Sequence, residues 1–351
     1  MTVRNKNALR THPIFSRSMI RAGLIAPVPP SQLESDATGL PLAYVIWRRD
    51  EAGLLSVLGT VLRGLEVARW LGATPIVDMT NFFTAYGTDS VPQQSNFWNQ
   101  LFEPLSALRI EDLDRNAFRI LFSDGNHAEK SVVDPERIFD FQRDYRAHIR
   151  FSEETRRWIE NRTETLALQD DVIGVHYRGG DMRTAPRHPL PPTAQQLIRR
   201  TKALLDSGEY NSVFLATNVA RGRKVFQKAF GGRLKLSPAH NELGSRRLPF
   251  SVPKGIAGVG RRSAAQRLET DGTIGLATAR DVLVDVVALS RCGALVCGAS
   301  NVSLMAKVFA DDPFRELSIV DNGQNGTSRL IAYTQWYVKR VLPSRLGGFD
   351  A

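Results

Sequence analysis

Short apolar runs and amphipathic stretches alternate along the chain. Residues 44–47 (Tyr-Val-Ile-Trp) and 74–78 are short runs typical of buried strands. Residues 54–71, between them, carry apolar side chains at helical spacing, and Gly72 ends this predicted helix. A strand, a helix and a second strand at this spacing predict a βαβ unit and therefore a parallel sheet.

The same alternation restarts in the second half of the chain. The pattern predicts strands at 172–177, 213–217, 294–297 and 317–320, and helices at 193–207, 218–231, 279–291, 302–310 and 333–341. Asn218 is expected to cap the helix that ends at Gly231. Residues 136–161 predict a long, strongly charged helical region at the end of the first half.

This restart divides the chain near residue 165. We expect a basic, flexible N-terminal arm at residues 1–39, Rossmann-like domains at 40–165 and 166–325, and a C-terminal helix and tail at 326–351. A chain of 351 residues is too long for a typical single core, which agrees with two domains.

Composition narrows the class of protein. The hydrophobic share of 42% and the charged share of 23% are ordinary for a globular protein, and no apolar stretch is long enough to span a membrane. Cys292 and Cys297 are too few for a disulfide framework and lack the partners of a zinc site. We therefore expect a cytoplasmic protein with two buried cysteines and no metal site.

The net charge of +10 predicts attraction to something anionic, such as a phosphorylated substrate, a membrane surface or a nucleic acid. Residues 1–33 contain several Lys and Arg residues and no acid, and residues 221–267 form a second basic stretch. Neither stretch has the interleaved aromatics of single-strand binders, so nucleic acid is an unlikely partner. The basic arm instead predicts a peripheral contact with an anionic membrane surface, such as an inner membrane.

Residues 173–181 (Ile-Gly-Val-His-Tyr-Arg-Gly-Gly-Asp) place polar chemistry at the end of a predicted strand. Side chains alternate along a strand, so His176 and Arg178 should project from the same face. Open α/β sheets bind ligands beyond the carboxyl ends of their strands, and a guanidinium there suits a diphosphate. The alternative is a structural ion pair between Arg178 and Asp181 across a tight turn.

Asp285 lies inside an almost wholly apolar helical run, residues 281–289. A buried carboxylate is costly unless it is paired or hydrogen-bonded. It could form a structural ion pair with Arg178 or Arg291. It could also recognise guanine, whose adjacent N–H donors one carboxylate can accept, and which other bases do not match. Both interpretations remain open.

Ser300 and Asn301 lie where a predicted strand ends and a helix begins. Both are ordinary helix caps, and capping alone explains them. The same geometry aims free backbone N–H groups and the helix dipole at an anion. Together with Arg178, this helix start predicts a diphosphate that is held from two sides.

Three segments, in this order, resemble the motifs of one enzyme family: residues 176–181 (His-x-Arg-x-x-Asp), residues 214–217 (Phe-Leu-Ala-Thr), and residues 284–292 followed by 299–302. The family is that of the GDP-fucose-dependent fucosyltransferases, which includes α1,6-fucosyltransferases, bacterial nodulation fucosyltransferases and protein O-fucosyltransferases. The likeness covers roughly residues 43–320.

The resemblance implies an α/β fold of the GT-B type, with two Rossmann-like domains facing each other across a cleft. It also implies an inverting, metal-independent glycosyltransferase that needs no cofactor. Such an enzyme would transfer fucose, or a related hexose, from a GDP-sugar donor to a hydroxyl of a glycan or a lipid-linked saccharide.

The resemblance further implies residue roles. The donor-binding residues would be His176, Arg178, Thr217, Asp285, Ser300 and Asn301. Arg178 would clamp the diphosphate and serve as a catalytic group. Ser300 and Asn301 would hold phosphate oxygens, whereas Asp285 with His176 would contact guanine.

The general base is not determined by the sequence. Asp181, His188 and Asp50 are candidates, and each has a structural alternative, such as a rigid Pro-containing loop around His188. Asp50 and Gly53, in the turn after the first strand, are candidates for the acceptor side.

Three departures from the family pattern favour an alternative. Gly179 stands where some α1,6-fucosyltransferases have Arg, Asn218 stands where Asp is common, and no acid precedes the His188–Pro189 pair. The alternative is a catalytically degenerate scaffold that binds a nucleotide or a polysaccharide. A binder of anionic polymers is a third hypothesis, favoured by the two basic stretches.

Overall fold

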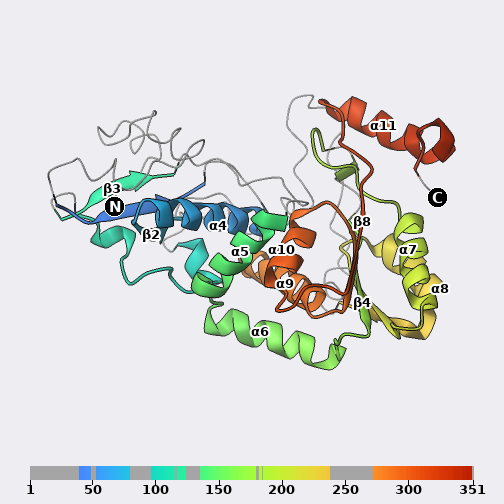
Figure 1. Cartoon of the computed structure of the whole chain (residues 1–351), viewed down its shortest axis with the longest axis horizontal. Helices are drawn as coiled ribbons and strands as arrows, with labels where there is room; N and C mark the ends of the chain where they lie inside the picture. The colour runs from blue at the N-terminus through green and yellow to red at the C-terminus, as the bar shows by residue number, and fades with distance from the viewer. Residues whose placement is uncertain are drawn as a thin grey trace. The chain divides into compact units, whose positions relative to one another are not determined.

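The computed structural model describes residues 39–48, 53–79, 96–114, 117–123, 135–178, 182–183, 185–237 and 272–349 (Figure 1). These residues divide into two compact units. The first contains the described residues up to Arg156 and the start of one later helix, up to Leu276; the second contains the rest. Each unit has its own parallel sheet, which confirms the predicted α/β class with two Rossmann-like parts. The domain limits and the cleft stay predictions.

The first unit is built on a parallel sheet of order β2-β1-β3. The strands are β1 (Leu42–Ile46), β2 (Thr74–Val77) and β3 (Arg119–Phe122), and helix α4 (Leu54–Trp70) connects the first two. Every residue of β1 is buried, and a Cβ at Gly64 of α4 would lie 2.6 Å from the Ile46 side chain. The helix therefore packs directly on the sheet, and the predicted βαβ unit is confirmed.

The charged helical region predicted at 136–161 consists of two helices, α5 (Pro135–His148) and α6 (Glu153–Thr163). Between them the backbone pairs with residues 101–103: Glu103 N donates to Arg150 O (2.9 Å), and Ser152 N donates to Leu101 O (3.0 Å). Ser152 Oγ then accepts from Thr155 N (3.3 Å), as an N-cap does. Tertiary pairing thus overrides the charged helical pattern.

The second unit contains five parallel strands in the order β6-β5-β4-β7-β8. The strands are β4 (Val172–His176), β5 (Ser212–Ala216), β6 (Leu234–Leu236), β7 (Ala294–Gly298) and β8 (Glu316–Val320). The helices beside them are α7 (Ala194–Asp206), α8 (Ala220–Phe230), α9 (Gly272–Ser290) and α10 (Asn301–Phe309). Figure 1 shows α7 and α8 on one face of the sheet and α9 and α10 on the other.

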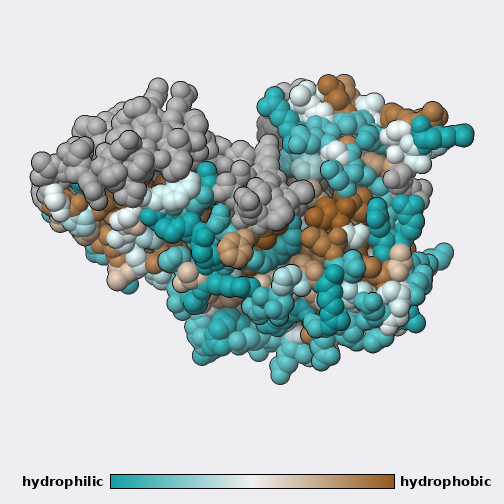
Figure 2. All heavy atoms as spheres, viewed as in Figure 1, coloured by the Kyte–Doolittle hydropathy of each residue, from teal (hydrophilic) through white to brown (hydrophobic). Residues whose placement is uncertain are grey.

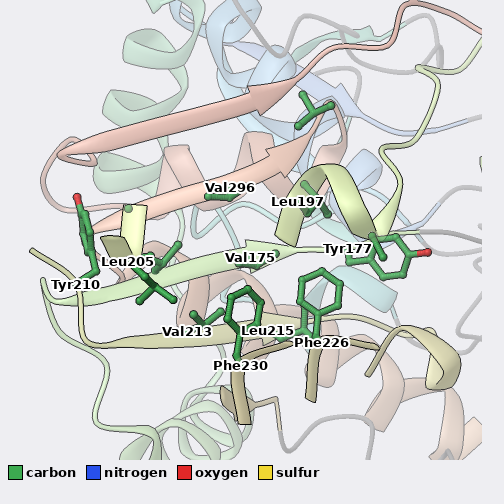
Figure 3. Packing of buried hydrophobic residues seen from close by; sticks show 14 residues of the cluster. Val175, Tyr177, Leu197, Leu205, Tyr210, Val213, Leu215, Phe226, Phe230 and Val296 are labelled. Carbon is green, nitrogen blue, oxygen red and sulfur yellow. The ribbon is translucent and has the colours of Figure 1, made fainter. Parts of the chain in front are cut away.

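The core on the α7–α8 face contains every second residue of β4. Val175 and Tyr177 pack with Leu215 and with Phe226 of α8 (Figure 3). On the opposite face, a Cβ at Gly174 would lie 3.1 Å from the side chain of Leu289 in α9. Packing on both faces explains why β4 is apolar up to His176, as is typical of parallel strands.

The two cysteines are buried, as the sequence predicts, and both are free thiols. Cys292 follows α9, and Cys297 lies in β7. Burial raises the pKa of both thiols, for Cys297 to about 11. At neutral pH the thiols are therefore protonated and behave as small apolar groups.

One predicted helix cap is wrong, and two helices begin several residues before their predicted starts. Helix α8 begins at Ala220, and its N-cap position is Val219, not Asn218. The hydroxyl of Thr217 accepts from Val219 N (3.1 Å), which replaces the predicted Asn cap. Helix α9 begins at Gly272, and α11 (Arg329–Val341) begins at its cap Ser328, both earlier than predicted.

Candidate nucleotide site at a sheet switch point

The candidate site lies where the order of the strands in the second sheet reverses. From β4 the chain proceeds outward through β5 to β6 and then crosses to β7, on the other side of β4. The connections that leave β4 and β7 therefore run to opposite faces of the sheet. In open α/β sheets, ligands bind at this topological switch point. Arg178 follows β4 there, and Ser300 follows β7.

His176, the last residue of β4, is held at this edge in its neutral form. Its side chain is buried (7% exposed), and Nδ1 lies 3.3 Å from the Oγ of Ser300. Burial, reinforced by the positive charge of Arg178, lowers the pKa of His176 from 6.5 to about 4, against a raising effect of Asp285. A neutral ring accepts through one nitrogen and donates through the other. His176 is therefore fit to bind a polar ligand without adding charge.

Ser300 caps helix α10 and contacts His176 through the same side chain. Its Oγ accepts from Ser303 N (3.1 Å), and the Oγ of Ser303 accepts from Ser300 N (3.0 Å). Of the two predicted caps, Ser300 is the cap, and Asn301 is the exposed first residue of the helix. The reciprocal cap fixes the start of α10, whose dipole carries a partial positive charge at this edge.

Arg178 and Thr217 follow two neighbouring strands. His176 pairs with Ala216 of β5, so Thr217 comes next to Tyr177 at the carboxyl edge. Thr217 is buried, and its hydroxyl accepts the backbone bond at the start of α8. Arg178 is partly buried and close enough to His176 to lower its pKa. The structure thus brings both predicted donor residues to the edge where His176 ends β4.

Asp285 is buried in α9 and connects three other segments. Its Oδ1 accepts from the Oγ of Ser237, directly after β6 (2.5 Å). Its charge also acts on His176 and on Arg223 of α8, in both cases raising the pKa. Arg291, one of the two predicted ion-pair partners, instead donates to the Oγ1 of Thr163 (3.0 Å).

His188 lies in a loop that is held by hydrogen bonds from Asn325, which follows β8. His188 O accepts from Asn325 N (2.8 Å), and the Asn325 amide donates to Met182 O and to Ala185 O (2.8 and 2.9 Å). The side chain of His188 is exposed. This bracing agrees with the structural alternative, a rigid loop, and leaves the role of His188 as a base a prediction.

Of the remaining candidates, Asp181 and Asp50 lie outside the described residues. Gly53 is the exposed N-cap position of α4 in the first unit. Its carbonyl accepts from Ser56 N (2.9 Å) and from Val57 N (3.2 Å), as a helix start requires. The acceptor side of the proposed reaction therefore stays a prediction.

The sequence did not single out Ser237, Arg223 or Ser303. Ser237 follows β6, a strand of three residues that is too short to give a clear apolar pattern. Arg223 belongs to an amphipathic helix with several other basic residues, so nothing in the sequence marks it. Ser303 could have been found, because Ser300 with Ser303 matches the spacing of a capping box.

Two general properties complete the site. Within the described part of the chain, no group of three or more His, Cys, Asp or Glu side chains is arranged to hold a metal ion. No described helix is both long and apolar enough to cross a membrane.

No protein family model matches the chain, and no curated protein matches it. Solved structures with a similar fold include NodZ α-1,6-fucosyltransferase co-crystallised with GDP, at 16% identity over 76% of this chain and 92% of that chain, with a TM-score of 0.47. They also include fucosyltransferase NodZ from Bradyrhizobium, at 16% identity over 76% and 93%, with a TM-score of 0.44.

A third similar structure is POFUT1 in complex with GDP-fucose, at 12% identity over 86% of this chain and 78% of that chain, with a TM-score of 0.36. Similarity at this level does not by itself assign an activity to this chain.

Proposed function

We propose that the chain is an inverting glycosyltransferase of the GT-B type that transfers fucose, or a related hexose, from a GDP-sugar to a hydroxyl of a glycan or a lipid-linked saccharide. One observation carries the proposal. Arg178, the neutral His176 and the capped start of α10 meet at the switch point between β4 and β7. The motif resemblance supports GDP and fucose in particular.

The diphosphate would be held by positive charge from two strands. The Arg178 guanidinium presents paired donors that match phosphate oxygens, and the first N–H groups of α10 add a partial positive charge. His176 would contribute a hydrogen bond and no charge. This arrangement uses no metal, because Arg178 and the helix dipole supply the positive charge that a leaving diphosphate needs.

The transfer would be a single displacement. The acceptor oxygen bonds to the anomeric carbon, the bond from that carbon to the β-phosphate oxygen breaks, and GDP leaves with the electron pair. The configuration at the anomeric carbon inverts, and the hydroxyl proton passes to a general base. Preplaced charge at the leaving group is worth about 3–4 kcal/mol of barrier per donor in comparable sites.

Guanine would be read by Asp285 together with His176. A carboxylate can accept from two adjacent N–H donors of guanine, and a base without them would leave the buried carboxylate poorly satisfied. The hydrogen bond from Ser237 already holds one oxygen of Asp285 in place. A fixed acceptor favours selectivity among nucleotides.

The first test compares GDP, UDP, ADP and CMP by thermal shift. GDP alone should stabilise the protein, by about 2.7 kcal/mol at a concentration of 100 times its Kd. Arg178→Ala should abolish this shift and lower transfer from GDP-fucose by about 100-fold or more, with little change in the Tm of the free protein. Arg200→Ala, an exposed arginine of α7, is the matched control and should behave as wild type.

Equal stabilisation by all four nucleotides, or full activity of Arg178→Ala, would refute the proposal. Stabilisation by GDP without turnover of any GDP-hexose would instead indicate the nucleotide-binding scaffold that the departures at Gly179 and Asn218 suggest.

A further inference from the structure

Helix α11 carries apolar side chains on the side that points away from its own unit. We call this side the outer face; it consists of the exposed residues Leu330, Ile331, Tyr333, Tyr337, Val338 and Val341. Leu330 is 75% exposed and Val341 is 79% exposed. Figure 2 shows hydrophobic side chains over α11, at the upper right. A surface helix normally has polar residues in these positions, so the outer face calls for a partner.

The opposite side of α11 already holds the helix in place. Trp336 is buried, packs with Leu190 and Phe349, and donates from Nε1 to Pro191 O (3.4 Å). Ala332, one turn before Trp336, is fully buried as well. Because these contacts anchor the helix, the outer face is not needed to hold α11 on its unit.

The charge around the outer face has one sign. Residues 322–349 contain Arg329, Lys339, Arg340 and Arg345 and neither Asp nor Glu. At 100° per residue, Arg329 and Arg340 lie on the same side of the helix and border Tyr333. Both arginines are exposed. The outer face is therefore an apolar strip with a positive edge.

We propose that the outer face of α11 docks on an anionic lipid bilayer. The aliphatic side chains would enter the boundary between headgroups and acyl chains, and the basic residues would meet lipid phosphates. Tyr333 and Tyr337, whose rings lie 4.4 Å apart, are the kind of amphipathic side chain that collects at this depth. A helix of 13 residues is about 20 Å long, so it lies in the interface and does not span it.

A second copy of the chain fits the outer face less well. A two-fold interface pairs the same patch on both chains, which would bring Arg329 and Arg340 of one copy against those of the other. Like charges at an interface cost several kcal/mol. The proposal concerns α11 alone and stands whether or not the chain is a glycosyltransferase.

The test is sedimentation of the full chain with vesicles of phosphatidylcholine, with and without phosphatidylglycerol. The wild type should bind the anionic vesicles and bind the neutral ones weakly. The double variant Leu330→Ser, Val341→Ser keeps every charge and should lower partitioning by about tenfold or more, because two aliphatic side chains no longer leave water. Phe139→Ser, on exposed α5 of the other unit, is the matched control and should bind as wild type.

A second measurement separates α11 from the other basic segments. Because Cys292 and Cys297 are buried, Val341→Cys provides one accessible thiol among the described residues for an environment-sensitive fluorophore. Its emission should shift to the blue on anionic vesicles. Wild-type binding by the double variant, or an unchanged emission, would assign binding to another segment and overturn the proposal. A dimer in sedimentation velocity that the double variant abolishes, without vesicle binding, would overturn it in favour of a protein interface.

Discussion

At the scale of single residues, His176 shows how burial sets a protonation state. The pKa falls to about 4 because the imidazolium would lose its hydration and lie near Arg178. In the unfolded chain the same ring has an ordinary pKa. Between these two values the unfolded state binds a proton that the folded state does not, so stability falls as the pH is lowered through this range.

The replacement His176→Asn tests this link, because an amide can replace Nδ1 as the hydrogen-bond partner of Ser300 but does not titrate. The stability that His176 contributes is complete above pH 6.5, declines below it, and stops declining near pH 4. Between pH 7 and pH 5, wild type should lose about 2 kcal/mol more stability than the variant. Urea unfolding at both pH values measures the difference, and equal losses in the two proteins would contradict the assigned pKa.

Residue-level prediction from the sequence succeeded where a local rule applied. The alternation of a strand placed His176 and Arg178 at one edge, and the start of a helix singled out Ser300. It failed where the partner comes from a distant segment. The bond from Ser237 to Asp285 spans 48 positions, and no local pattern shows it. Long-range contacts of this kind depend on the fold as a whole.

At the scale of elements, helix α8 packs closely on the end of strand β4 because residue 222 is a glycine. A Cβ at Gly222 of α8 would lie 2.6 Å from Cε1 of Tyr177, between His176 and Arg178. The ring also packs against Phe226, with centroids 5.7 Å apart. Gly222 therefore leaves room for the ring of Tyr177 to pack against α8. The packed ring in turn helps to position the end of β4.

We expect Gly222→Ala to destabilise the protein by about 1–2 kcal/mol, since overpacking outweighs the better helix propensity of Ala. The displaced ring should also weaken GDP binding. Gly232→Ala is the control, because a Cβ there meets nothing within 4 Å. Thermal unfolding and GDP titration of both variants measure the effects. Unchanged stability and affinity in Gly222→Ala would show that the Tyr177 ring moves aside without cost, and would contradict this prediction.

Most elements were predictable because both sheets are parallel and their central strands, β1, β4 and β7, are almost wholly apolar. The local pattern did not show where tertiary contacts replace local preference. The charged stretch around Arg150 and Ser152 leaves the helical path to pair with residues 101–103. Strand β6 has only three residues, which are too few to show a pattern of apolar and polar positions.

At the scale of the molecule, each compact unit has its own buried core. In the first, Phe102 stacks on Trp98 and faces Phe151. In the second, the cluster on β4 and β5 provides the core (Figure 3). All the candidate donor residues belong to the second unit, so a bound nucleotide should act on the stability of that unit.

Hydrogen exchange tests this expectation. GDP should slow exchange at the first turn of α10 and at the end of β4, because opening these segments would release the ligand. Amides of β1 and α4 should exchange as before. Arg178→Ala should remove the protection. Protection confined to the first unit would place the nucleotide elsewhere and contradict the switch-point site.

Residues 322–326 are bonded on two sides. Toward the loop after β4, Gly323 O accepts from Leu190 N (2.8 Å), and Asn325 N donates to His188 O (2.8 Å). Toward α11, Gln324 O accepts from the Gln335 side chain (3.0 Å). Residues 322–326 thus connect α11, which carries the outer face, to the loop that follows β4 at the candidate site. Thermodynamic linkage then applies. If binding to a lipid surface changes the affinity for the nucleotide by some factor, nucleotide binding changes the affinity for the surface by the same factor.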